Sequence, residues 1–152
     1  MIQDVKREEL LAFIRKLYEL NCGPRTAYNR AVMYGLRTDI DLGFLKGREI
    51  IQVAIGVYQI IFGFDDDVRI SVEGEFSYFD GQSGSVWRPE PGGAQIASRT
   101  LSLLGATIET FTGEENGTLT LTFSNGHRLT ILDNSKEYES YDITRPGETI
   151  VV

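Results

Sequence analysis

The sequence contains very little cysteine and histidine. Among its 152 residues, Cys22 is the only cysteine and His127 is the only histidine. An intrachain disulfide needs two cysteines and is therefore excluded. A structural zinc site needs several cysteine or histidine ligands. We therefore expect folding to require no metal, and we predict no cofactor.

The chain also lacks a long apolar run and an excess of basic residues. Its longest apolar stretch, residues 53–64, is interrupted by Gly56, Gln59 and Gly63 and is too short for the roughly 20 residues of a membrane helix. Acidic residues within the first 16 positions are not typical of a signal peptide, so we expect a cytoplasmic protein without membrane contact. The net charge of −7 disfavours nucleic acid as a partner. It suits a basic protein partner, but simple solubility explains it as well and is the interpretation we favour.

No catalytic motif is present. His127 has serines and acids around it in the sequence, but the G-x-S-x-G nucleophile elbow is absent, and we expect this histidine to face solvent on a hairpin. The glycine-rich loop after Asp80 lacks both phosphate-binding patterns. We therefore predict no catalytic, cofactor-binding or metal-binding residue, and we lean against an enzyme.

One strand–turn–strand pattern occurs twice. Residues 60–72 and 119–131 carry matching apolar residues, and Ile60 corresponds to Leu119 with an offset of 59 positions (119 minus 60) that later pairs keep. Apolar residues alternate in both copies, and Asn125-Gly126 is a strong signal for a tight hairpin turn. We predict that the two hairpins are structurally equivalent and bury Phe62, Phe64, Leu121 and Phe123 on one face.

The remaining segments predict one domain, residues 1–152, of the α+β class. Its sheet is mostly antiparallel and built from two pseudo-repeated β-hairpin units, with N-terminal helices and one short helix between the repeats. The expected parts are an N-terminal helical region (1–44), a first β repeat (45–80), a loop with a short helix (81–105) and a second β repeat (106–152).

Several segments resemble a bacterial domain family of unknown function. They are "LKGREI" from Leu45, "VYQIIFGF", "RISVEGEF", "LSLLG", "NGTLTLTFSNGHRLTI" and "YESYDI" ending at Ile143. The family pattern has a tryptophan where this chain has Tyr141. The resemblance covers about residues 45–143 and implies no catalytic residues. Some small acidic proteins of this kind are similar to toxin-immunity proteins.

The candidate binding residues are two pairs of aromatic and charged side chains. Trp87 and Arg88 lie in the long loop 80–93, and such residues are enriched at binding hot spots, although a loop tryptophan can also anchor the core. Tyr138 and Tyr141 suit protein recognition, but tyrosines are also ordinary on sheet faces. We predict these four residues as the protein-binding set.

Two acidic groups have a structural and a functional interpretation. The run Asp65–Asp67 is either a solvated hairpin turn, which we favour, or a cation site. Four glutamates are either a polar sheet face, which we favour, or a source of paired carboxylates: Glu73, Glu75, Glu137 and Glu139.

The function we expect is that of a non-enzymatic bacterial protein-binding module, an immunity or accessory protein that binds a basic partner. One alternative is a small-ligand binder or enzyme that uses the cleft between the repeats. Another is a structural subunit that dimerises through its N-terminal helices, so a homo-oligomer stays open.

Overall fold

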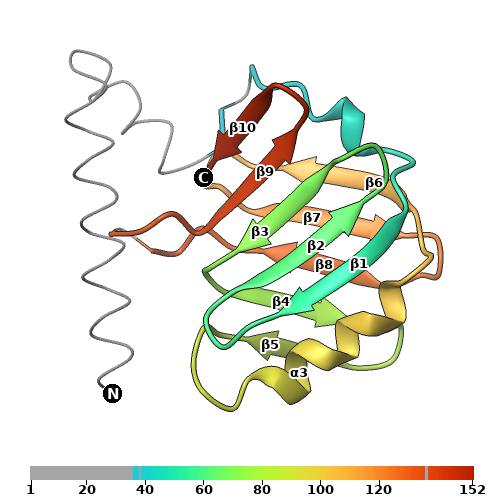
Figure 1. The fold of residues 1–152 in the computed structure, drawn as a ribbon, viewed down its shortest axis with the longest axis vertical. Helices are drawn as coiled ribbons and strands as arrows, with labels where there is room; N and C mark the ends of the chain where they lie inside the picture. Colours follow the sequence, from blue (N-terminus) through green and yellow to red (C-terminus); the bar gives the residue numbers. More distant parts are fainter. Residues whose placement is uncertain (1–35, 38, 136) are drawn as a thin grey trace.

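The structure, a computed structural model, describes residues 36–37, 39–135 and 137–152. Ten strands form two five-stranded antiparallel sheets that face each other (Figure 1). The first sheet has the order β1-β2-β3-β9-β10 and the second has the order β5-β4-β8-β7-β6. The strands are β1 (Ile50–Ile55), β2 (Ile60–Phe64), β3 (Arg69–Val72), β4 (Phe76–Phe79), β5 (Gly84–Trp87), β6 (Ile108–Gly113), β7 (Leu119–Phe123), β8 (Arg128–Ile131), β9 (Tyr141–Arg145) and β10 (Glu148–Val151).

Helical structure in the described part is short. It comprises the 3₁₀ turn η1 (Gly43–Leu45), the helix α3 (Ala94–Ser98) and its 3₁₀ continuation η2 (Arg99–Leu103). The short helix predicted between the repeats is therefore confirmed, but the α+β class is wrong, because a second sheet covers the first where a helical layer was expected. The N-terminal helices were predicted mainly within residues 1–35, which lie outside the described residues. Among the described residues of 36–44, only Gly43 and Phe44, the start of η1, are helical. No helix in the described part is long and apolar enough to cross a membrane.

The duplicated hairpin is confirmed, and the repeats are interlaced. In the first repeat, β1, β2 and β3 form one side of the first sheet, and the chain then crosses over so that β4 and β5 complete the second sheet. The second repeat does the reverse, because β6, β7 and β8 lie in the second sheet while β9 and β10 complete the first. Each sheet thus contains three strands of one repeat and two of the other.

The interlaced repeats are related by pseudo-twofold symmetry, and the hydrogen bonds between them follow it. The Gly47 N–H donates to the Ile108 carbonyl at 2.8 Å, and the Gly105 N–H donates to the Ile50 carbonyl at 2.9 Å. A bridge between Glu49 and Thr107 lies between these pairs. The two repeats are therefore joined by equivalent contacts at the start of their first strands.

The core is a single cluster between the sheets. Strands β2 and β7 share one burial pattern, with alternate side chains buried, which places Phe62, Phe64, Leu121 and Phe123 inside as predicted. The Phe62 ring meets the Phe76 ring edge-on, with centroids 5.9 Å apart, and so joins β2 of the first sheet to β4 of the second. Phe76 in turn stacks on Trp87. Aromatic packing thus joins the two sheets into one core.

The segment that precedes each repeat covers an open side between the sheets. Helix α3 contacts β5 and β1, which are edge strands of different sheets (Figure 1). At the opposite side, Leu36 and Leu42 lie against Gly113 of β6, where a Cβ atom would collide with Leu36. The Arg145 guanidinium of β9 lies 4.4 Å from the centre of the Phe44 ring.

The first hairpin holds two aspartates in the left-handed region. Asp66 and Asp67 have φ values of 56° and 58°, whereas the second hairpin places Gly126 at 85°. Left-handed backbone costs most residues roughly 1–2 kcal/mol, and aspartate tolerates it better than most. The Asp66 carboxylate pairs with Arg48. The run Asp65–Asp67 is therefore a turn, as favoured, and the described residues contain no group of three or more potential metal ligands.

Truncating the shared core is expected to destabilise the protein strongly. Phe62→Ala removes a fully buried ring and should lower the free energy of unfolding by roughly 3–5 kcal/mol. Ile51→Ala is the control, because this side chain is 59% exposed and should change stability by about 0.5 kcal/mol or less. Urea denaturation at constant pH measures both, and equal losses would contradict the assignment of the core.

Relieving the strained turn is expected to stabilise the protein. Asp67→Gly should raise the free energy of unfolding by about 0.5–1 kcal/mol, because glycine adopts positive φ without a steric penalty. Gly126→Ala, its counterpart in the second hairpin, should lower it by about 1 kcal/mol. Thermal and urea unfolding measure both changes. A lower free energy of unfolding for Asp67→Gly would contradict this account.

Candidate functional site: a cavity at the two crossovers

The chain passes between the sheets twice, and the two crossovers differ in length. Residues 73–75 link β3 to β4, whereas residues 132–140 link β8 to β9. The strands before and after them are equivalent in the two repeats. The second crossover is thus nine residues against three, and its additional residues are not required by the duplicated architecture.

Main-chain hydrogen bonds fix the crossovers to each other. The N–H groups of Glu73 and Gly74 both donate to the Ser140 carbonyl oxygen, at 2.9 and 2.8 Å. The Leu132 N–H donates to the Glu75 carbonyl oxygen at 3.0 Å. A Cβ atom on Gly74 would lie 3.1–3.2 Å from Ser140 atoms, which is tighter than most Cβ contacts, so the two backbones approach each other closely. The crossovers therefore form a rigid seam.

A cavity of about 360 Å³ opens at this seam. This volume lies at the lower end of the range of small-ligand pockets, roughly 300–1,000 Å³. Three carboxylates and one guanidinium line it, together with polar groups and one tyrosine, so the lining is net negative: Glu73, Glu75, Glu139, Arg88, Asn134 and Tyr138. The long crossover supplies the last two of these and Glu139, so the extra residues build one wall of the cavity.

Glu75 is the best-defined side chain of the cavity. Its Oε2 accepts a hydrogen bond from Asn134 Nδ2 at 2.9 Å, and its Oε1 lies 3.5 Å from Arg88 Nη2. The side chain of Glu75 is 20% exposed, whereas that of Arg88 is 58% exposed. An ion pair of this length with one exposed partner contributes only about 0–1 kcal/mol. Arg88 is therefore weakly held at the mouth of the cavity, while Glu75 is fixed within it.

The structure brings two of the four predicted binding residues together. Arg88 and Tyr138 come from different repeats and line the same cavity. Trp87 is fully buried, as in the anchor interpretation. Tyr141 is also buried, and its hydroxyl donates to the Gly117 carbonyl at 2.6 Å. Burial raises the pKa of this phenol above its usual range. The buried pair supports the strands from which the cavity walls extend, and a binding role for the other pair stays a prediction.

The four glutamates considered as a source of paired carboxylates are also partly assembled. Glu73, Glu75 and Glu139 meet in the cavity, whereas Glu137 is exposed and does not line it. Alternation in the sequence suggested one strand face for Glu73 and Glu75, but both belong to the first crossover. The sequence does contain a signal for this site. The segment that follows the second hairpin is six residues longer than the one that follows the first, and Glu139 lies in it.

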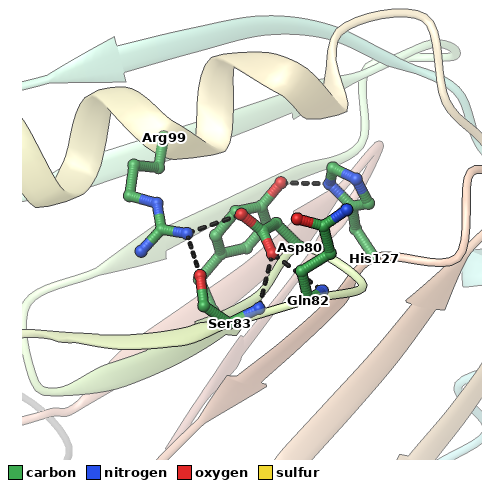
Figure 2. A network of polar contacts seen from close by, with 6 residues as sticks. Asp80, Gln82, Ser83, Arg99 and His127 are labelled. Atoms are coloured by element: carbon green, nitrogen blue, oxygen red, sulfur yellow. Dashed lines mark hydrogen bonds and ion pairs between the residues drawn. The ribbon is translucent and has the colours of Figure 1, made fainter.

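A second polar cluster lies beside η2 and the loop after β4 (Figure 2). Asp80 Oδ1 accepts hydrogen bonds from the N–H groups of Ser83 at 2.8 Å and Gln82 at 3.0 Å, and its Oδ2 accepts one from Arg99 at 2.6 Å. These bonds hold the pKa of the Asp80 carboxyl well below its usual range, the backbone donors contributing most. Arg99 also donates to Ser83 Oγ at 2.9 Å. The cluster ties the loop to η2, which is a structural role.

His127 lies in the same region. We predicted that its side chain faces solvent, and this prediction is wrong. It is half-buried, its Nδ1 is hydrogen-bonded to the Tyr78 hydroxyl, and the two rings meet edge-on with centroids 5.5 Å apart. Burial, with a smaller contribution from Asp80, raises the pKa of Tyr78 to about 12. This pairing could not be predicted from the sequence, because the two residues are 49 positions apart and meet only because β4, which holds Tyr78, pairs with β8, which begins directly after His127.

Comparison with known proteins places the chain in a family. Residues 43–152 match the family described as "Family of unknown function (DUF6188)". The chain belongs to this family. The match includes both repeats, both crossovers and the cavity, and it agrees with the resemblance to a family of unknown function seen in residues 45–143. No curated protein and no solved structure gave a significant match.

The close approach of the crossovers predicts the effect of a methyl group at Gly74. Gly74→Ala should lower the free energy of unfolding by about 1–3 kcal/mol, because its Cβ atom would press on the Ser140 backbone. Gly84→Ala is the control, since its nearest neighbour lies 3.8 Å away and the change should stay within about 0.5 kcal/mol. Urea denaturation distinguishes them, and an unchanged midpoint for Gly74→Ala would argue against a rigid seam.

Proposed function

We propose that this protein is a non-enzymatic binding module whose crossover cavity receives a positively charged side chain of a basic partner protein. The observation that carries the proposal is the convergence of three glutamates from both crossovers in one cavity. The guanidinium of Arg88 already lies beside Glu75 at its mouth, which is the chemistry that an incoming arginine would use.

The charge of the whole chain supports the same partner. The net charge of −7 attracts a basic protein over long range and raises its association rate, more strongly at low salt. Within the cavity, carboxylates can accept hydrogen bonds from a guanidinium, and Tyr138 offers an aromatic face beside them. The long-range field would bring the partner to the protein, and the cavity would select the side chain.

The lining favours binding over catalysis. It contains no histidine, cysteine or lysine among the described residues, so any acid–base chemistry would fall to the carboxylates. A small cationic ligand is the second candidate, because the volume of about 360 Å³ also suits a small molecule. The sequence resemblance suggests that the binding serves an immunity or accessory role in a bacterium. The cytoplasmic location also stays a prediction.

The test measures binding of single side-chain probes by NMR titration. N-acetyl-arginine amide and N-acetyl-lysine amide should shift the backbone resonances of the two crossovers, whereas N-acetyl-glutamate amide should not. Glu75→Gln with Glu139→Gln should weaken binding of the arginine probe at least tenfold, or about 1.4 kcal/mol. Arg88→Gln should tighten it, because the competing guanidinium is lost.

A matched variant separates the cavity from the general charge. Glu114→Gln with Glu115→Gln removes the same charge from exposed positions outside the cavity lining and should change the affinity less than about twofold. Equal weakening by both double variants, or shifts scattered away from the crossovers, would contradict the proposal. A cationic metabolite that binds tighter than basic peptides would favour the second candidate. All variants are first compared by thermal unfolding.

A further inference from the structure

Each sheet contains three strands of one repeat and is completed by two strands of the other. The strands of the two repeats meet along two equivalent strand seams, which are distinct from the seam formed by the crossovers. In the first sheet β3 pairs with β9, with Ile70 opposite Ile143. In the second sheet β4 pairs with β8, with Tyr78 opposite Leu129. All four of these side chains are buried. Without its counterpart, each repeat would expose the strand edge that now pairs with the other repeat, together with a large apolar surface.

The contacts at the start of the repeats add a third shared region. The Ile50 N–H donates to the Ala106 carbonyl at 2.9 Å, and the Ile108 N–H donates to the Arg48 carbonyl at 2.9 Å. These bonds are related by the same pseudo-twofold symmetry as the seams. Each of these contacts joins one repeat to the other, so the corresponding repeat of a second molecule could form it in the same way.

We propose that the repeats are exchangeable between molecules, so that the seam surfaces of each repeat fit a second copy of this chain and two chains form a strand-exchanged dimer. Each half of the dimer contains residues 36–93 of one chain and residues 94–152 of the other. The contacts within each half are those of the monomer, so only the connection between repeats changes.

The connection between the repeats suits this exchange. Residues 88–93 join β5 to α3 and include Pro89 and Pro91, which favour extended backbone before and at each proline. Six extended residues span about 20 Å. Opening this loop lets the second repeat leave its own partner and join another molecule.

The dimer would also rebuild the crossover cavity from two chains. Glu73, Glu75 and Arg88 would come from one chain, and Tyr138 and Glu139 from the other. The dimer would carry two such cavities. The exchange itself does not depend on what the cavity binds.

The test is complementation between two full-length variants, each disabled in a different repeat. Phe62→Asp places a charge in the buried face of the first repeat, and Leu121→Asp does so at the equivalent position of the second. Each variant alone should lack a cooperative thermal transition. If either retains one, Ile70→Asp or Leu129→Asp is added within the same repeat. The two variants are then unfolded together in urea and refolded as a mixture at high concentration.

Exchange predicts that one half of the mixed dimer contains two intact repeats. The mixture should therefore regain a cooperative transition with about half the wild-type circular dichroism amplitude, in a species of twice the chain mass by light scattering. A mixture of Phe62→Asp and Ile70→Asp chains, both disabled in the first repeat, is the matched control and should not recover. Failure of the complementary mixture to recover, or equal recovery in the control, would overturn the proposal.

Discussion

The protein depends on one constraint: the chain must cross between the sheets in both repeats. Because β4 and β5 leave the sheet of their own repeat, and β9 and β10 do the same in return, neither sheet can be completed by one half of the sequence. The single core follows from this, since the Phe62–Phe76 contact joins opposite sheets through strands of the same repeat. Local hairpins are thereby converted into one cooperative unit, in which backbone pairing and burial reinforce each other.

The cavity follows from an imperfection in that symmetry. Backbone hydrogen bonds join the crossovers on both sides, from Glu73 to Ser140 and from Leu132 to Glu75. The longer crossover, residues 132–140, keeps the bonds to Ser140 and adds residues beyond them, which form a wall without disturbing the sheets. Insertions in connections are tolerated far better than insertions in strands, so this is where a duplicated scaffold can acquire a binding site. Its acidic lining is the basis on which we propose a positively charged partner.

The hairpins could be predicted from the sequence because their signals are local. Alternation around Phe62 and Leu121, and the Asn125-Gly126 turn, determine strands and turn within a dozen residues. The exchange of strands could not be predicted, because the alternation in β4 and β9 is the same whichever sheet they join. That ambiguity also produced the wrong fold class and hid the cavity, whose carboxylates become neighbours only through the crossovers. The Tyr78–His127 contact was missed for the same reason.

Native-state hydrogen exchange tests the interlaced architecture most directly. If each sheet needs both repeats, the amides of β3 and β9 in one sheet and of β4 and β8 in the other can be exposed only by global unfolding. Their opening free energies should then be equal to one another and to the free energy of unfolding from urea denaturation. A lower opening free energy for the strands of one repeat, with the other repeat still protected, would show that the repeats fold separately and would contradict the account.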